Sequence, residues 1–129
     1  MRIARYFTQA GTSPYGSIRF VPRSSEIRNP DGSVVFRQDR FLAPESWSQL
    51  AVDILAQKYF RKAGVPQQDE QGRPLLDEHG QPVLGGEWDA RQVFHRLAAC
   101  WTHWGTTHGY FDTDDDAQAF YDELCYMLA

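Results

Sequence analysis

Short apolar runs broken by polar residues occupy the first forty positions, which is the pattern of short β-strands. Residues 17–22 read Ser-Ile-Arg-Phe-Val-Pro, and residues 33–37 read Ser-Val-Val-Phe-Arg. Residues 29–32 between them read Asn-Pro-Asp-Gly, where Pro presets a negative φ and Gly accepts the positive φ that closes a hairpin. The pattern predicts a β-hairpin, and it leaves room for residues 41–42 to extend the sheet after a kink at 38–40.

The spacing of apolar residues changes to a helical period after this hairpin. Ser46 and Gln49 have the spacing of a capping box, which predicts Ser46 as the N-cap of a helix. We expect the helix to run to about Ala63, because Gly64 supplies a left-handed stop and Pro66 prevents resumption. Its apolar stripe is predicted to be core and consists of Trp47, Leu50, Ala51, Ile54, Leu55 and Tyr59.

Two more helices are predicted in the second half of the chain. Asp89 and Gln92 form another capping-box pair, and the helix that they start is expected to end at Gly105. Thr113 is the predicted N-cap of the last helix, whose first turn holds three aspartates that suit the positive end of a helix dipole. The sequence stops at Ala129 inside this helical pattern, so we expect the chain to be the front part of something longer.

Two stretches have no regular period. Residues 1–16 are rich in Gly and Pro after their first apolar positions and are expected to form an extended arm, which needs a surface on its own domain or on a neighbour. Residues 66–86 are polar and are predicted to be a mobile loop, in which residues 69–76 are echoed by residues 77–84. This favours a tandem duplication within a loop or a small exposed hairpin. Together, the elements predict one α+β domain over residues 1–129, in which a small antiparallel hairpin sheet packs with about three helices.

Composition narrows the classes of function. The chain has 129 residues and a net charge of −4, with a pI of about 5.5, which argues against a dedicated nucleic-acid binder. It has no signal-peptide pattern and no apolar run long enough to span a membrane, so the cytoplasm is the expected location. Charge is unevenly distributed along the chain, which fits either a solvated surface or docking onto a protein or an anion. Seven arginines fall in the first forty residues: Arg2, Arg5, Arg19, Arg23, Arg28, Arg37 and Arg40.

Candidate chemistry is sparse. His95, Cys100, His103 and His108 fall within 14 residues, but they lack the spacing of a metal site, and we expect no metal. Cys100 and Cys125 lie within apolar helical patterns and are predicted to be buried free thiols rather than nucleophiles. No phosphate-binding loop or nucleophile-elbow motif is present in the sequence.

One aromatic cluster stands out near the predicted end of the second helix. It consists of Trp101, Trp104, Tyr110 and Phe111. These rings fit either the core of the domain itself or a docking surface for a partner, where aromatic residues are enriched.

Long stretches of the chain resemble the N-terminal region of class II, adenosylcobalamin-dependent ribonucleotide reductases. The stretches are residues 25–36 (SEIRNPDGSVVF), 44–66 (PESWSQLAVDILAQKYFRKAGVP), 85–105 (GGEWDARQVFHRLAACWTHWG) and 109–128 (GYFDTDDDAQAFYDELCYML), and the opening residues 1–23 are also similar. Nearly the whole chain outside the repeat-bearing loop takes part in the resemblance.

The resemblance implies a full enzyme that reduces ribonucleotides to deoxyribonucleotides by a thiyl-radical mechanism, a vitamin B12-dependent ribonucleoside-diphosphate reductase, although the choice between diphosphate and triphosphate stays open. The family's catalytic cysteines and cobalamin contacts lie in an α/β barrel outside this region, so no catalytic or cofactor residue is carried over to this chain. The expected role is structural: the region braces that barrel, which is its expected partner. A homodimer is a further expectation. The 129 residues alone are expected to have no activity and to bind no adenosylcobalamin. The alternative is a freestanding interaction or nucleotide-effector-binding module derived from the same domain.

Overall fold

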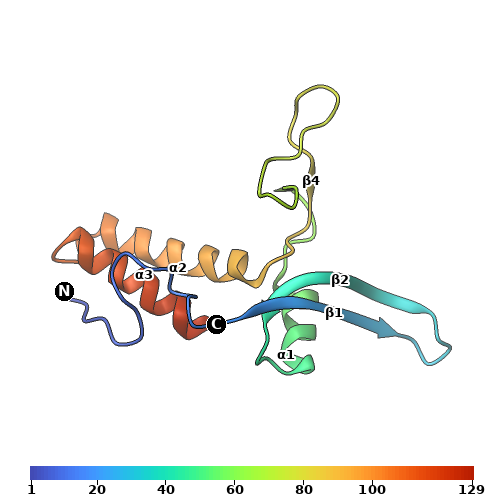
Figure 1. The fold of residues 1–129 in the computed structure, drawn as a ribbon, viewed down its shortest axis with the longest axis horizontal. Helices are drawn as coiled ribbons and strands as arrows, with labels where there is room; N and C mark the ends of the chain where they lie inside the picture. The colour runs from blue at the N-terminus through green and yellow to red at the C-terminus, as the bar shows by residue number, and fades with distance from the viewer.

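The computed structural model describes residues 1–129, and a long β-hairpin is its first regular element (Figure 1). Strands β1 (Phe20–Arg28) and β2 (Val34–Pro44) pair antiparallel, from Phe20 opposite Pro44 to Arg28 opposite Val34. The predicted turn is confirmed, since the Asn29 N–H donates to Ser33 O at 2.8 Å and a positive φ of 87° falls on the glycine of the turn. Both strands are longer than the sequence pattern predicted.

The predicted kink in the return strand is a β-bulge. Arg23 lies opposite Phe41 and Ser25 opposite Gln38, so one residue of β1 faces two residues of β2. Arg40 takes a positive φ of 58° at this point, which is uncommon for a residue other than glycine. The bulge lets the sheet continue beyond the kink to the end of β2.

Helix α1 (Gln49–Ile54) starts later than predicted. Ser46 is not the N-cap, because the Trp47 N–H bonds to Pro44 O and places Ser46 inside a turn. Ser48 caps the helix, and its hydroxyl accepts the Ala51 N–H at 3.1 Å. The Gln49 side chain, predicted to complete a box with Ser46, donates instead to a carbonyl of β1.

The first helix also ends earlier than predicted. A π-helical turn, η1 (Leu55–Tyr59), continues α1, and Phe60 then turns extended with ψ of 130°. The Arg61 N–H donates to the Glu87 carboxylate at 2.7 Å, while Arg61 O accepts the Glu87 N–H at 2.9 Å. This distant partner takes the backbone groups that a helix running to Ala63 would have needed.

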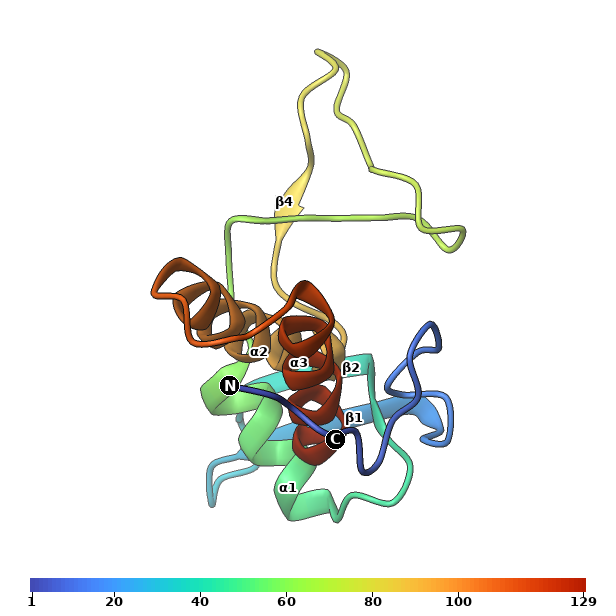
Figure 2. The same cartoon turned by 90° about the vertical axis from the view of Figure 1, so that its left-hand side faces the viewer.

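Helices α2 (Ala90–Thr107) and α3 (Asp114–Leu128) run side by side (Figures 1 and 2). The capping box of Asp89 with Gln92 and the N-cap Thr113 are both confirmed. Gly105 does not end α2, because the helix continues to Thr107. A Cβ at Gly105 would lie 2.5 Å from the Phe111 ring, so this glycine serves close packing rather than termination.

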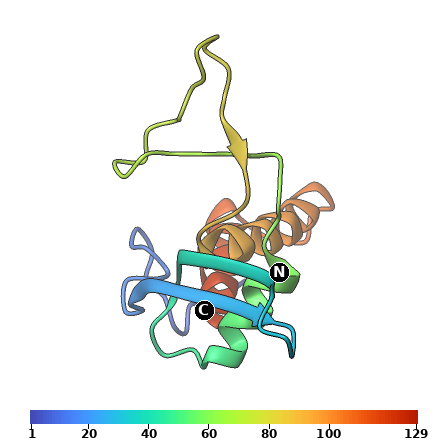
Figure 3. The ribbon, with the colours of Figure 1, turned by 90° about the vertical axis from the view of Figure 1, so that its right-hand side faces the viewer.

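Strand β2 passes in front of the helices in Figure 3, and the core cluster joins β2 with α1, η1 and α2. Phe41 packs edge-to-face on Phe60 with ring centroids 5.4 Å apart. The core cluster consists of nine buried residues: Phe41, Ala43, Val52, Leu55, Ala56, Phe60, Ala90, Val93 and Phe94. The α+β class, with an antiparallel hairpin sheet and three helices, is confirmed.

The repeat in residues 66–86 is a structural repeat that stands away from the rest of the chain in all three views. The two-residue strands β3 (Val65–Pro66) and β4 (Leu84–Gly85) pair at its base. Above them, three residues spaced eight apart form a closed ring of backbone bonds: Gln67 N–H to Val83 O, Val83 N–H to Leu75 O, and Leu75 N–H to Gln67 O, at 2.9–3.0 Å. The duplication that the sequence indicated is therefore visible in space, while the mobility of the segment stays a prediction.

Candidate docking surfaces

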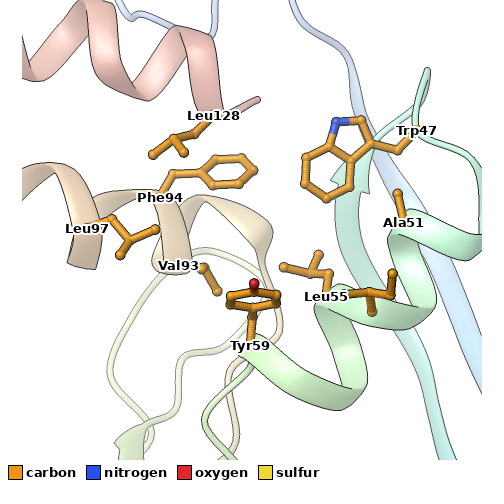
Figure 4. Close-up of a pocket in the computed structure, with 9 residues that line it drawn as sticks. Trp47, Ala51, Leu55, Tyr59, Val93, Phe94, Leu97 and Leu128 are labelled. Atoms are coloured by element: carbon orange, nitrogen blue, oxygen red, sulfur yellow. The ribbon is translucent and has the colours of Figure 1, made fainter.

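An apolar groove opens between α1–η1 and α2 (Figure 4). Its volume is about 370 Å³, within the range of pockets that hold small ligands. Every lining residue is hydrophobic: Trp47, Ala51, Ile54, Leu55, Tyr59, Val93, Phe94, Leu97 and Leu128. The groove therefore suits apolar side chains and offers almost nothing to a charged ligand.

The predicted apolar stripe supplies one wall of the groove, and the fold leaves part of this stripe uncovered. Leu55 is buried, but Ile54 is 44% exposed and Tyr59 is 57% exposed. Leu50, from the same stripe, is 69% exposed and does not line the groove. The prediction that the whole stripe is core is thus wrong for these three residues, because a helix of six residues and one π-turn buries only the side that meets the hairpin and α2.

The π-turn shapes the groove wall. The Phe60 N–H reaches back to Leu55 O at 3.0 Å, which is the i to i−5 bond of a π-helix. Single π-turns are rare and occur often at functional sites. Here the wider turn carries Leu55 and Tyr59, two of the lining side chains.

A buried ion pair fixes one end of the groove. Glu87 is 3% exposed, and Arg96 of α2 donates to both of its carboxylate oxygens, at 2.8 and 3.1 Å. The same guanidinium donates to Tyr59 O at 2.9 Å, so it ties η1 to α2. Burial alone raises the pKa of Glu87, but the hydrogen bonds from Arg96 and the Arg61 N–H outweigh it and hold the pKa below its ordinary value.

The other end is closed by the last residues of α3. The Trp47 indole N–H donates to Ala129 O at 2.8 Å, and its ring lies 5.7 Å from the ring of Phe94. Leu128 lines the groove beside them (Figure 4). The end of α3 therefore lies at the rim of the groove.

The predicted aromatic docking surface divides in two. Trp101 and Trp104 on α2 are 46% and 55% exposed, and Tyr110 after the helix is 60% exposed. Phe111 is half-buried, packed against Gly105 and 5.4 Å from the ring of Phe120. Three of the four rings are thus free to meet a partner, and the fourth anchors the α2–α3 connection.

Most of the early arginines are engaged by acceptors of their own chain. Arg5 pairs with Asp122 at 2.7 Å and Arg37 with Asp39 at 2.8 Å, and Arg23 donates to Trp47 O at 2.9 Å. The hairpin therefore offers scattered, satisfied charges rather than a convergent site for a phosphate.

The histidines and cysteines do not converge either. His95 Nδ1 lies 2.7 Å from the Tyr121 hydroxyl, and no group of three metal-ligating side chains occurs in the structure. Cys100 is exposed, so its predicted burial is wrong: it lies on the outer side of α2. Cys125 is buried as predicted, and burial raises the pKa of its thiol.

The apolar groove has few polar groups for the amide side chains of a corrin ring. The Trp47 indole N–H already donates to Ala129 O, which leaves the Tyr59 hydroxyl. The polar cleft between α2 and α3 is wide open, and His103 and His95 at its wall are both exposed. A membrane span would need a longer apolar stretch than any helix of the structure provides.

The groove was not predicted from the sequence, although the apolar stripe of residues 47–59, which forms one of its walls, was visible there.

Comparison with known proteins identifies the family. A family model described as class II vitamin B12-dependent ribonucleotide reductase matches residues 21–129. A vitamin B12-dependent ribonucleotide reductase of Bradyrhizobium diazoefficiens is 51% identical over 145 aligned positions, which cover 100% of this chain and 12% of the relative. One from Agrobacterium fabrum is 50% identical, with 100% and 11% covered, and one from Rhodopirellula baltica is 30% identical, with 96% and 10% covered.

The chain spans about a tenth of the length of these curated relatives. The similarity covers the hairpin, all three helices and the groove between them. The resemblance read from the sequence is confirmed, and the chain belongs to the class II vitamin B12-dependent ribonucleotide reductase family, matching its longer members in their N-terminal region.

Proposed function

We propose that this chain is the N-terminal structural portion of an adenosylcobalamin-dependent reductase that converts ribonucleotides to deoxyribonucleotides by a radical mechanism. The observation that carries the proposal is the match of residues 21–129 to the family, over a region that makes up only 11–12% of the two most similar relatives named above. The catalytic barrel, the cobalamin and the reacting cysteines belong to the remaining part of the enzyme. The enzyme would work in the cytoplasm.

The role of these residues would be to brace and dock the catalytic barrel. An apolar groove with half-exposed lining residues supports this role, because monomeric proteins rarely leave a large contiguous apolar surface uncovered. The exposed rings of Trp101, Trp104 and Tyr110, with Phe111 behind them, form a second docking surface, for the barrel or for another subunit of a homodimer.

A reductase assay tests whether activity requires the part of the enzyme outside these 129 residues. The 129-residue chain with adenosylcobalamin, a dithiol reductant and each ribonucleoside diphosphate or triphosphate should give no deoxyribonucleotide. The full-length reductase that carries this region should turn over under the same conditions and show which phosphate state it prefers. Turnover by the 129-residue chain would contradict the proposal.

The alternative is a freestanding module that binds an effector nucleotide, which the arginine-rich first third favours. In the structure most of these arginines already meet carboxylates or carbonyls of the chain. Titration of the chain with dATP, ATP and dTTP by calorimetry separates the two functions. A bracing element shows no saturable binding, whereas an effector module saturates with at least one of the three.

A further inference from the structure

We propose that the apolar groove between α1–η1 and α2 holds the polypeptide that directly follows this region in the full-length reductase. The inference rests on the proposed function and adds to it the identity of the groove's occupant. The occupant is an apolar segment of the same polypeptide, not a second copy of the chain and not a small molecule.

The chemistry of the lining defines what fits. All nine lining residues are hydrophobic, and only two of them carry a polar group: the Trp47 indole N–H, already used by Ala129 O, and the hydroxyl of the half-exposed Tyr59. An inserted segment must therefore present apolar side chains, because a charged or unpaired polar group would lose its water without gaining a partner.

The position of α3 points to the following polypeptide rather than to a distant one. Leu128 is part of the groove wall, and Ala129 is held at its rim by Trp47. The relatives are many times longer than this region, which is their N-terminal part. In such a protein the next residues emerge beside the groove, so their effective concentration there is far above that of any separate molecule.

Hydrogen bonds within the chain already hold both ends of the groove in place. Arg96 bridges Glu87 and Tyr59 O at one end, and at the other Trp47, just before α1, donates to Ala129 O at the end of α3. A wall that is already fixed loses little conformational freedom when it is covered, which makes the covered state easier to reach.

Cysteine labelling distinguishes a covered groove from an open one. In a Cys100→Ser background, Ile54→Cys places a thiol on the groove wall, and Leu50→Cys places one on the same helix outside it. Each variant is labelled with a maleimide, both as the 129-residue chain and within the full-length reductase, and the modified peptide is quantified by mass spectrometry. Ala51→Cys is a second groove variant if Ile54→Cys impairs folding.

In the 129-residue chain both positions should label readily. In the full-length reductase, Ile54→Cys should label at least about tenfold more slowly, while Leu50→Cys should change by less than about twofold. Equal labelling of Ile54→Cys in the two forms would overturn the proposal. Concentration-dependent protection in the 129-residue chain would overturn it in favour of a second copy, and protection that is lost on dialysis would overturn it in favour of a small molecule.

A photo-crosslinker identifies the occupant. Benzoylphenylalanine at position 54 of the full-length reductase should form crosslinks with the residues that directly follow position 129, and crosslinks to another part of the enzyme would overturn the assignment. Reductase turnover of the unmodified full-length protein is measured in parallel. Turnover with an unprotected Ile54→Cys refutes only the groove assignment, whereas absence of turnover refutes the proposed function itself.

Discussion

Residues 1–16 and residues 66–86 look alike in the sequence and differ in how the fold holds them. Both are irregular segments rich in Gly and Pro. The N-terminal arm lies along α3 and is bonded by side chains more than 110 positions away. The repeat-bearing segment stands away from the body and is bonded almost entirely within itself (Figure 1).

Acidic side chains of α3 hold the N-terminal arm. Asp116 accepts the Ile3 N–H at 2.9 Å, and Glu123 accepts the backbone N–H groups of Tyr6 and Phe7. The Phe7 ring stacks on the Tyr126 ring of α3, with ring centroids 4.8 Å apart. The surface on which the arm lies is therefore part of its own domain.

In the repeat segment, carboxylates only a few residues away accept the backbone N–H groups. The Asp69 carboxylate accepts the N–H groups of Gln71 and Arg73, and Asp77 does the same for His79 and Gln81, at 2.8–2.9 Å. An irregular sequence therefore does not by itself indicate a segment that is detached from the body of the fold. What matters is whether the backbone groups find partners in the body of the fold or only nearby in the chain.

Arg5→Met should give the largest effect, because it breaks the partly buried pair that anchors the N-terminal arm. Asp122 has a side chain only 6% exposed and would keep just the Gln118 amide at 2.9 Å. Loss of one partner of a buried pair typically costs 3–5 kcal/mol, and we expect about 3 kcal/mol at neutral pH. Urea denaturation measures it. The matched control, Arg2→Met, removes an exposed arginine of the same arm and should change stability by less than about 0.5 kcal/mol. Equal effects would show that the arm is not anchored by this pair.

Glu123→Gln should have an intermediate effect. The amide oxygen can still accept both N–H groups, but the charge that strengthens the bonds to Tyr6 and Phe7 is lost, and the second oxygen that accepts the Phe7 N–H becomes an NH2 donor. We expect a loss of about 1–2 kcal/mol and faster hydrogen exchange at these two amides. Glu70→Gln, in the repeat segment, replaces an exposed carboxylate and should be silent in both measurements. Unchanged amide hydrogen exchange at Tyr6 and Phe7 would show that Glu123 does not anchor the arm.

Acidification should affect the two segments in different ways. The pKa of Asp116 is lowered, chiefly by the Ile3 N–H and then by the Thr113 hydroxyl, and the pKa of Asp69 is lowered chiefly by the Arg73 N–H. A carboxyl with a lowered folded-state pKa stabilises the fold fully above its unfolded value of about 3.9, and this contribution is lost as the pH falls through the folded pKa.

Below about pH 4 the arm should therefore begin to leave α3, whereas protonation of Asp69 loosens only its own turn. Amide chemical shifts of Ile3 and Arg73, followed by NMR titration, report the two events separately. Asp116→Asn should remove the titration at Ile3, while Asp115→Asn, its exposed neighbour without a bonded partner, should leave it intact. A titration at Ile3 that persists in Asp116→Asn would refute the assignment.

The sequence predicts best those features that are decided within a few residues. The turn at 29–32, the Asp89–Gln92 box and the Thr113 cap all depend on neighbours in the chain, and all are confirmed. The start at Ser46 is wrong because a competing turn from Pro44 was not recognised.

Features decided by distant partners were not predictable in the same way. The helix ends at Tyr59 rather than Ala63 because a carboxylate 26 positions away captures the Arg61 N–H. The groove depends on how α1–η1 sits against α2 and the end of α3, a long-range arrangement that the helical period of the stripe does not specify. The burial of Cys100 was predicted from a helical period that does not say which face of α2 meets α3.

Deleting one copy of the repeat should have the smallest effect of all. Removal of residues 69–76 joins Gln68 to Asp77, so the remaining turn follows Gln67 and Gln68, and the Gln67–Val83 backbone bond is kept. Shortening the 21-residue segment 66–86 by eight residues lowers the entropy cost of closing it by about 0.4 kcal/mol, from 1.5RT ln(21/13). The free energy of unfolding should therefore stay the same or rise slightly. A loss above about 1 kcal/mol would show that the segment supports the body, and the contrast with the N-terminal arm would fail.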